Sequence, residues 1–309
     1  MNAFAYLVRR ETWEHKALYR APLITAVVLI VVVLLALLKA AASGFFSSGL
    51  DHIGMSVDML TPKYLQVVSP MMMATMYGII FTVGTFVAIF YLLDSLYAER
   101  KNRSILFWKS LPISDTETVL AKLLAATVLV PIAALVSVVA CWLIMQLIAA
   151  VTIGLLGGSG WPVLWQPGVL FNGIAVAVKG SAGLLLWYLP IAGWLLLVSV
   201  WARRSVFIWA VAPPAIIVTV EHWLFDSEHF LNLLGTRLVG FNTMVRDSEV
   251  VRIFGADMDD VSGITMSEAM NQMISFSKLL TEPGLYGGIL VAAAFVTGAI
   301  FLRRYRDET

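Results

Sequence analysis

Long apolar runs alternate with short charged segments along this chain of 309 residues. A helix needs about 20 apolar residues to cross the roughly 30 Å hydrocarbon layer of a bilayer. Backbone polar groups must find partners within lipid, which favours helices over isolated strands. Six runs are long enough to span, namely 21–38, 71–93, 123–150, 181–202, 205–225 and 283–302. The pattern therefore predicts an all-α integral membrane protein with six transmembrane helices in a single membrane domain, 1–309.

The composition agrees with a membrane protein and excludes some other classes. Hydrophobic residues make up 60% of the chain and charged residues 13%, against about 25% charged residues in soluble domains. The net charge of +1 gives no large basic surface for nucleic acid. Cys141, the single cysteine, lies within an apolar run, so we expect a buried or lipid-facing thiol rather than a reactive one.

The distribution of Lys and Arg predicts the orientation. If the N-terminus, the 94–122 loop, Arg203-Arg204 and the C-terminal tail share one side, that side holds 14 basic residues and the other side holds 7. Basic loops stay inside, so both termini and the 94–122 loop are expected in the cytoplasm. Residues 1–20 lack the cleavage site of a signal peptide, and we expect them to form a helix at the cytoplasmic interface. Glu11 and His15 interrupt its apolar face.

The segment 226–282 is then extracytoplasmic. It contains two apolar stretches that could form short helices, about 230–241 and a second one after Thr265, where Glu268 completes a capping-box spacing. These helices could dip into the outer membrane face or pack on the bundle as a small cap. Within span five, Pro213-Pro214 is expected to break the helix, either as a hinge or as a fixed kink.

Two residue sets could hold a metal ion, although a structural role is favoured for both. The first set lies at the outer end of span five and consists of His222, Asp226 and His229. The two histidines are seven positions apart, a spacing that allows both side chains to lie on one face of a helix but does not establish it. We interpret them as interfacial polar residues. The second set, at the start of span two, could also form a soft-metal or hydrophobic path but fits ordinary helix packing, and consists of Met71, Met72, Met73 and Met76.

The 94–122 loop is a charged island between two spans, and its pattern predicts ordered structure. On a helical wheel, Ile105, Phe107, Trp108 and Leu111 fall within one arc of about 160°. Pro112 disfavours helix at the preceding residue and ends this element. A second helix is then expected to start at Ser114, with Glu117 completing a capping box, and to continue into span three. The predicted order is a short helix, a sharp stop and a capped helix.

The aromatic face of this loop admits two interpretations. It could dock on a partner protein, because buried aromatic residues with nearby Arg are common anchors of interfaces. It could instead hold the loop at the lipid headgroups, where Trp and Phe also collect.

The stretch 97–114, YAERKNRSILFWKSLPIS, resembles the signature that follows the second span in permease subunits of type-two ABC exporters. The resemblance implies a coupling helix that fits a groove on a separate ATPase subunit. Glu99, Arg100 and Arg103 would meet that ATPase by charge. The remaining residues implied in coupling would fill or border its groove, and are Ile105, Phe107, Trp108, Lys109, Leu111 and Pro112.

The sequence contains no G-x-x-x-x-G-K-[ST] phosphate loop. The resemblance therefore implies a non-enzymatic chain without a cofactor of its own, with ATP and Mg²⁺ on the ATPase. Two ATPase copies would join two copies of this chain in a bacterial cytoplasmic membrane, with the substrate path between the two permeases. A secondary transporter is a rival hypothesis, but it would need ionisable residues at mid-membrane, which the spans essentially lack. A membrane-embedded metal-dependent enzyme is the other alternative.

Overall fold

The computed structural model describes residues 3–43, 62–155, 161, 165, 167–246 and 276–305. All regular elements in these residues are helices, and no strand occurs among them. The elements are α1 (Ala3–Glu14), α2 (Ala17–Ala42), α4 (Pro62–Lys101), α5 (Ser104–Ser110), α6 (Asp115–Leu124), the π-helical η3 (Ala125–Leu129), α7 (Val130–Leu155), α9 (Pro167–Trp201), α10 (Val206–Phe225), α11 (His229–Arg246), α14 (Phe276–Thr281) and α15 (Pro283–Tyr305).

Each of the six predicted spans coincides with a helix that is long and apolar enough to cross a membrane. Several helices are much longer than their apolar runs. The 40 residues of α4 extend about 60 Å at 1.5 Å per residue, and α6, η3 and α7 form one continuous rod. An apolar run marks the part of a helix that lipid requires, whereas the charged turns at its ends are stabilised by contacts within the protein.

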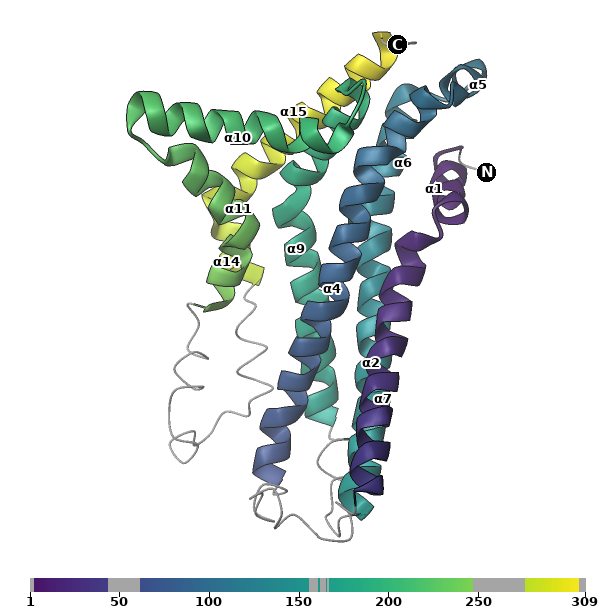
Figure 1. The fold of residues 1–309 in the computed structure, drawn as a ribbon, viewed down its shortest axis with the longest axis vertical. Coiled ribbons are helices and arrows are strands. Elements are labelled where there is room, and N and C mark those ends of the chain that lie inside the picture. Colours follow the sequence, from purple (N-terminus) through teal and green to yellow (C-terminus); the bar gives the residue numbers. More distant parts are fainter. Residues whose placement is uncertain are drawn as a thin grey trace.

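The long helices α2, α4, α7 and α9 pack side by side, and α15 packs along α9 (Figure 1). Small residues permit this close packing, as in many membrane bundles. A Cβ atom added to Gly193 of α9 would lie 3.1 Å from the backbone oxygen of Ala292 in α15. Trp142 and Cys141 of α7 are buried against Met73 and Met76 of α4, so these methionines and the thiol serve helix packing.

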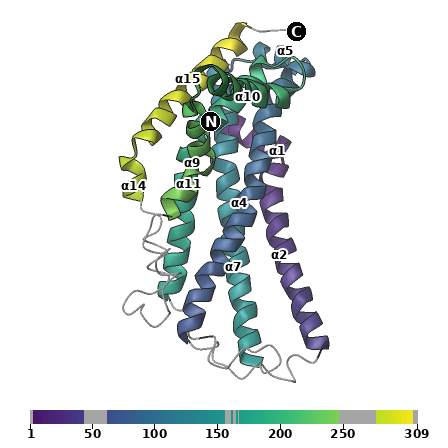
Figure 2. The ribbon, with the colours of Figure 1, turned by 60° about the vertical axis from the view of Figure 1, so that its left-hand side comes forward.

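The two chain ends and α5 lie at the same end of the molecule (Figures 1 and 2). This arrangement is compatible with both termini and the 94–122 loop on one side of the membrane. That this side is the cytoplasm stays a prediction. A helix forms in the N-terminal segment, but it ends at Glu14, before α2 begins at Ala17.

The helix α10 differs from the prediction in two ways. It runs without a break from Val206 to Phe225, so the expected interruption at Pro213-Pro214 is wrong. Pro214 has no N–H to donate to the carbonyl of Ala210, and the indole Nε1 of Trp194 donates to that oxygen instead, at 3.0 Å. Such a substitute donor lets a helix continue past proline.

Second, α10 lies across the end of α9 at a large angle to α4, α7 and α9 (Figures 1 and 2). The turns on either side of it are sharp, because Ser205 and Asp226 both adopt left-handed backbone conformations, with φ of 51° and 48°. The predicted helix at 230–241 is present within α11. The helix predicted after Thr265 lies largely outside the described residues, which resume at Phe276 with α14.

Candidate functional site

The short helix α5 stands between α4 and α6 at the end of the molecule that carries both termini. Its first turn follows Arg103, whose left-handed backbone (φ 55°) separates α5 from α4. At its other end Leu111 is extended, with ψ of 151°, as the following Pro112 requires. The predicted helix and its sharp stop are therefore both present.

The capping box predicted at the start of α6 is also present. The backbone N–H of Glu117 donates to Ser114 Oγ at 3.1 Å, and the N–H of Ser114 donates to Glu117 Oε2 at 3.0 Å. Both bonds satisfy N–H groups that a helix start leaves without partners. The connection from α5 to span three is thus a defined turn rather than a loose linker.

The side chains of α5 divide into an inner and an outer set. Ile105 is 2% exposed and anchors the helix on the bundle. Leu106 and Phe107 are 49% and 60% exposed. Phe107 packs edge-on against the partly buried Trp108, with ring centroids 5.1 Å apart. The apolar arc drawn on the wheel is therefore split, and an outward patch of Leu106 and Phe107 remains.

Contacts from the two ends of the chain hold α5 in place. The guanidinium of Arg10 in α1 stacks over the Trp108 ring, 3.9 Å from its centroid. Such cation–π contacts contribute about 0.5–2 kcal/mol, depending on how dry the site is. Lys109 Nζ donates to the carbonyl of Arg304 in α15 at 3.4 Å. The element therefore contacts the first and last described helices.

A buried ion network lies beneath this element and joins four helices. Its centre is Glu99, in the last turns of α4, which is 7% exposed. Arg303 Nη1 of α15 donates to Glu99 Oε2 at 2.6 Å. Lys122 Nζ of α6 lies 3.1 Å from Glu99 and 3.1 Å from Glu11 of α1. Because removing one partner strands the others in a low dielectric, such a network makes these helices mutually dependent.

Further groups complete the network. Arg303 Nε also donates to Asp115 at 3.0 Å, and Arg10 Nη2 donates to Glu11 at 2.7 Å. Arg10 Nε lies 3.4 Å from the exposed Glu14 as well, so four carboxylates face three cations. Burial raises the pKa of Glu11, but Lys122, a hydrogen bond from Tyr91 and Arg10 together outweigh it and hold the pKa below its ordinary 4.5. Glu11 is therefore ionised at neutral pH.

The end of α4 is also bonded to the end of α9. Ser199 Oγ accepts the backbone N–H groups of Leu96 and Tyr97, at 3.1 and 3.0 Å. Arg100 Nη2 donates to the carbonyls of Ser199 and Ala202, each at 2.8 Å. Ala202 immediately precedes the turn into α10, so the base of α5 is connected to the corner where the chain changes direction.

Comparison with known families gives one match to this region. Residues 58–160 match the model of the family described as ABC-2 family transporter protein, about a third of the chain. The match confirms the resemblance to ABC-2 permeases. Neither the search of curated proteins nor that of solved structures found a match. The matched stretch includes α4, α5, α6, η3 and α7, and so contains the 94–122 loop and two members of the ion network, Glu99 and Lys122.

The structure places the predicted coupling residues in two different settings. Glu99 and Ile105 are buried, and Arg100 is bonded to α9, so these three support the element from within. Trp108 and Lys109 contact α1 and α15. The others are partly or fully exposed, and are Arg103, Phe107, Leu111 and Pro112. Whether any of them contacts an ATPase stays a prediction.

Sequence reasoning missed the internal partners of Glu99. Lys122 and Arg303 were interpreted only as part of the positive charge that orients the chain. One signal was available, because Glu11 interrupts the apolar face of the N-terminal helix. A carboxylate on a packed face needs a buried cation, and the structure supplies Lys122.

The candidate metal ligands at the end of α10 do not gather in the part of the chain that the structure describes. The side chain of His229 is 90% exposed, and its Nδ1 lies 4.0 Å from Glu221 Oε1. His222 lies 3.9 Å from Glu228. Glu221 instead accepts the N–H groups of His229 and Phe230 and so caps the start of α11. These polar residues fit the interfacial, structural interpretation.

Proposed function

We propose that this chain is the membrane permease of an ATP-driven exporter and that it receives the force of ATP binding through α5. Two copies would assemble with two copies of a separate ABC ATPase, which holds ATP and Mg²⁺, in a bacterial cytoplasmic membrane. The family match and the six apolar helices support a membrane transporter. The observation that carries the coupling role is the exposed Leu106–Phe107 patch on a firmly held short helix.

The contact surface we propose is not the full set of coupling residues that the sequence resemblance implies. Leu106 and Phe107 would enter the groove of the ATPase, with Arg103 and Leu111 at the rim. Apolar and aromatic anchors at the centre of an interface usually contribute most of the binding energy. Glu99, Arg100 and Ile105 would act indirectly, by keeping the patch in position.

A displacement of α5 would reach the spans through three described connections. Arg10 and Glu11 lead to α1, Arg303 leads to α15, and Arg100 leads to the α9–α10 corner. Movement of the ATPase would therefore act on both ends of the chain together. Such rigid connections suit a permease that alternates between two packed states.

The test is co-purification with the ATPase. The tagged full chain is expressed with the candidate ATPase subunit, extracted from membranes and assayed for bound ATPase and for ATP hydrolysis. Replacing an interface anchor by alanine costs 2 kcal/mol or more of binding free energy. This loss corresponds to a dissociation constant that is roughly 30-fold larger. We expect that loss for Phe107→Ala and a similar one for Leu106→Ala.

Phe171→Ala is the control, because Phe171 is also an exposed phenylalanine and lies near the start of α9, at the other end of the bundle from α5. It should leave both readouts unchanged. Undiminished ATPase recovery and hydrolysis with Phe107→Ala and Leu106→Ala combined would show that the patch serves the lipid headgroups instead.

A further inference from the structure

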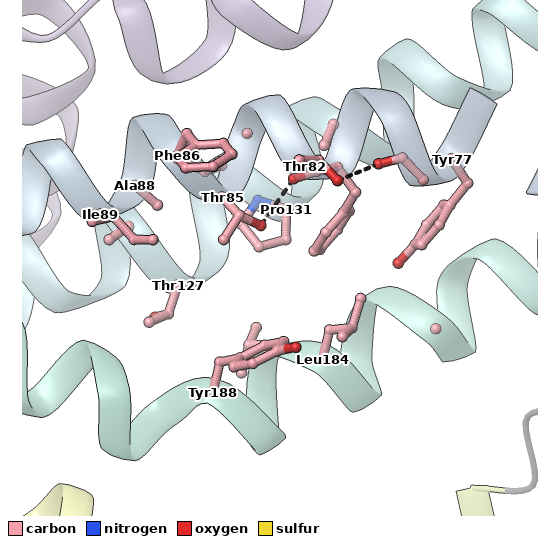
Figure 3. A pocket seen from close by; sticks show the side chains of 18 of the residues that line it. Tyr77, Thr82, Thr85, Phe86, Ala88, Ile89, Thr127, Pro131, Leu184 and Tyr188 are labelled. Carbon is pink, nitrogen blue, oxygen red and sulfur yellow. Dashed lines mark hydrogen bonds between the residues drawn. The ribbon is translucent and has the colours of Figure 1, made fainter. Parts of the chain in front are cut away.

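A cavity of about 680 Å³, partly open at the surface, lies between α4, the η3–α7 segment and α9. Figure 3 shows Tyr77 of α4 and Tyr188 of α9 beside the space between these helices, with Thr127 and Pro131 behind it. Its volume lies within the range of about 300–1,000 Å³ that is usual for small-molecule sites.

Small side chains create this space. Gly78 and Ala88 face it from α4, Ala126 from η3, and Gly180 and Ala192 from α9. A Cβ atom added to Gly78 would meet nothing within 4 Å. The glycine therefore leaves room that no neighbouring side chain fills.

The described lining carries no Asp, Glu, Lys, Arg or His. Its polar side-chain groups are hydroxyls that already donate their protons to other groups of the protein. Thr82 and Thr85 donate to the carbonyls of Gly78 and Phe81, at 2.7 and 2.9 Å. Thr127 donates to Leu123 at 2.8 Å. The walls therefore offer lone pairs that can accept hydrogen bonds, but no charge that would compensate an ion.

The hydroxyl of Tyr188 also donates its proton to a backbone carbonyl, that of Leu238, at 3.0 Å. Tyr77 shares a bond of 3.2 Å with Ser181. Four aromatic rings, those of Tyr77, Phe81, Phe86 and Tyr188, and a set of acceptor oxygens thus border an otherwise aliphatic space. A ligand that fits must be uncharged and mainly apolar, with hydrogen-bond donors if it is polar at all.

One wall of the cavity has an irregular backbone. The segment η3 is π-helical from Ala125 to Leu129, and its Ala126 and Thr127 line the cavity. Pro131, also in the lining, has no N–H and so cannot donate back to the preceding turn. Single π-turns within α-helices are frequent at functional sites. This observation is independent of the side-chain chemistry and points to the same place.

We propose that this cavity binds an uncharged, predominantly apolar molecule with a hydrogen-bond donor. The inference deepens the proposed function, since such a molecule would be the class of cargo that the permease moves. Binding itself needs no ATPase. It can therefore be tested on the permease alone, and its outcome is separate from that of the docking experiment.

The probe is N-phenyl-1-naphthylamine, an uncharged fluorophore with one N–H, titrated against the full chain in lipid nanodiscs with empty nanodiscs subtracted. Gly78→Phe should place a ring in the cavity, from a Cβ that meets nothing within 4 Å, and weaken binding at least tenfold. Gly154→Phe is the matched control, because Gly154 of α7 also has open space around it but lies outside the lining. We expect it to bind like the unaltered chain.

The sulfonated analogue 1-anilinonaphthalene-8-sulfonate supplies the charge test and should bind at least tenfold more weakly than the neutral probe. Displacement of the neutral probe by monoolein would identify a membrane lipid as the occupant, and its absence a soluble molecule. Equal binding by Gly78→Phe and Gly154→Phe would overturn the site. Equal binding of the two probes to the unaltered chain would overturn the ligand class.

Discussion

The carboxylate of Glu99 touches cations from three other helices, and Glu99→Gln removes its charge while keeping its shape. Arg303 lies 2.6 Å away, Lys122 3.1 Å and Arg10 3.7 Å. Removing one partner of a buried ion pair costs about 3–5 kcal/mol. Arg303 and Lys122 keep second carboxylates as partners, so we expect the lower end of this range, about 3 kcal/mol.

The measurement is the free energy of unfolding of the purified chain, obtained from reversible titration with SDS in mixed micelles. Asp94→Asn is the control, because Asp94 is an exposed carboxylate on the same helix. It should change the free energy by less than about 0.5 kcal/mol. Combining Glu99→Gln with Lys122→Met should reveal a coupling energy of about 1–3 kcal/mol, as expected for residues in one network.

Two results would refute this reasoning. Effects of Glu99→Gln and Lys122→Met that add to within 0.5 kcal/mol would show that the two side chains do not support one another. A Glu99→Gln chain of unchanged stability that had lost its ATPase would place Glu99 at the partner surface instead.

Three other substitutions should change the same unfolding free energy. Ser114→Ala removes the cap of α6 and should cost about 1 kcal/mol; no loss would mean that the cap contributes nothing. Trp194→Phe leaves the Ala210 carbonyl without a donor and should cost about 1–3 kcal/mol, whereas the exposed Trp223→Phe should be neutral; equal effects would contradict the role of the indole. Because the pKa of Glu11 is lowered on folding, its contribution is present above pH 4.5 and is lost as the pH falls through the lower folded pKa. Glu11→Gln should therefore make stability less dependent on pH in this acidic range, and an unchanged pH profile would count against the network.

The helices were predictable because lipid imposes a simple rule on sequence. A run of about 20 apolar residues has few alternatives in a bilayer. The short signals around α5 were equally local. A proline restricts the residue before it, and a Ser followed three residues later by Glu forms two defined bonds, so Leu111 and Ser114 could be placed without a fold.

The features that sequence reasoning missed depend on distant residues. Glu99 and Arg303 are separated by 204 positions, and no local pattern indicates that they meet. The wheel grouped Ile105 with Phe107 on one face, but the structure buries Ile105 and exposes Phe107, because the surrounding helices decide which side chain is covered. The proline pair in span five likewise looked like a break, because the indole that compensates it comes from a different helix, α9.

The long sequence separation between two members of the ion network also has a consequence for the synthesis of the protein. Glu99 emerges from the ribosome long before Arg303, and at 5–20 residues per second the 204 positions between them take roughly 10–40 s to synthesise. Through that interval the N-terminal helices hold a carboxylate whose nearest cation does not yet exist. Insertion of α15 supplies Arg303 last, so we expect the buried ion network to be complete only when the last described helix is in place.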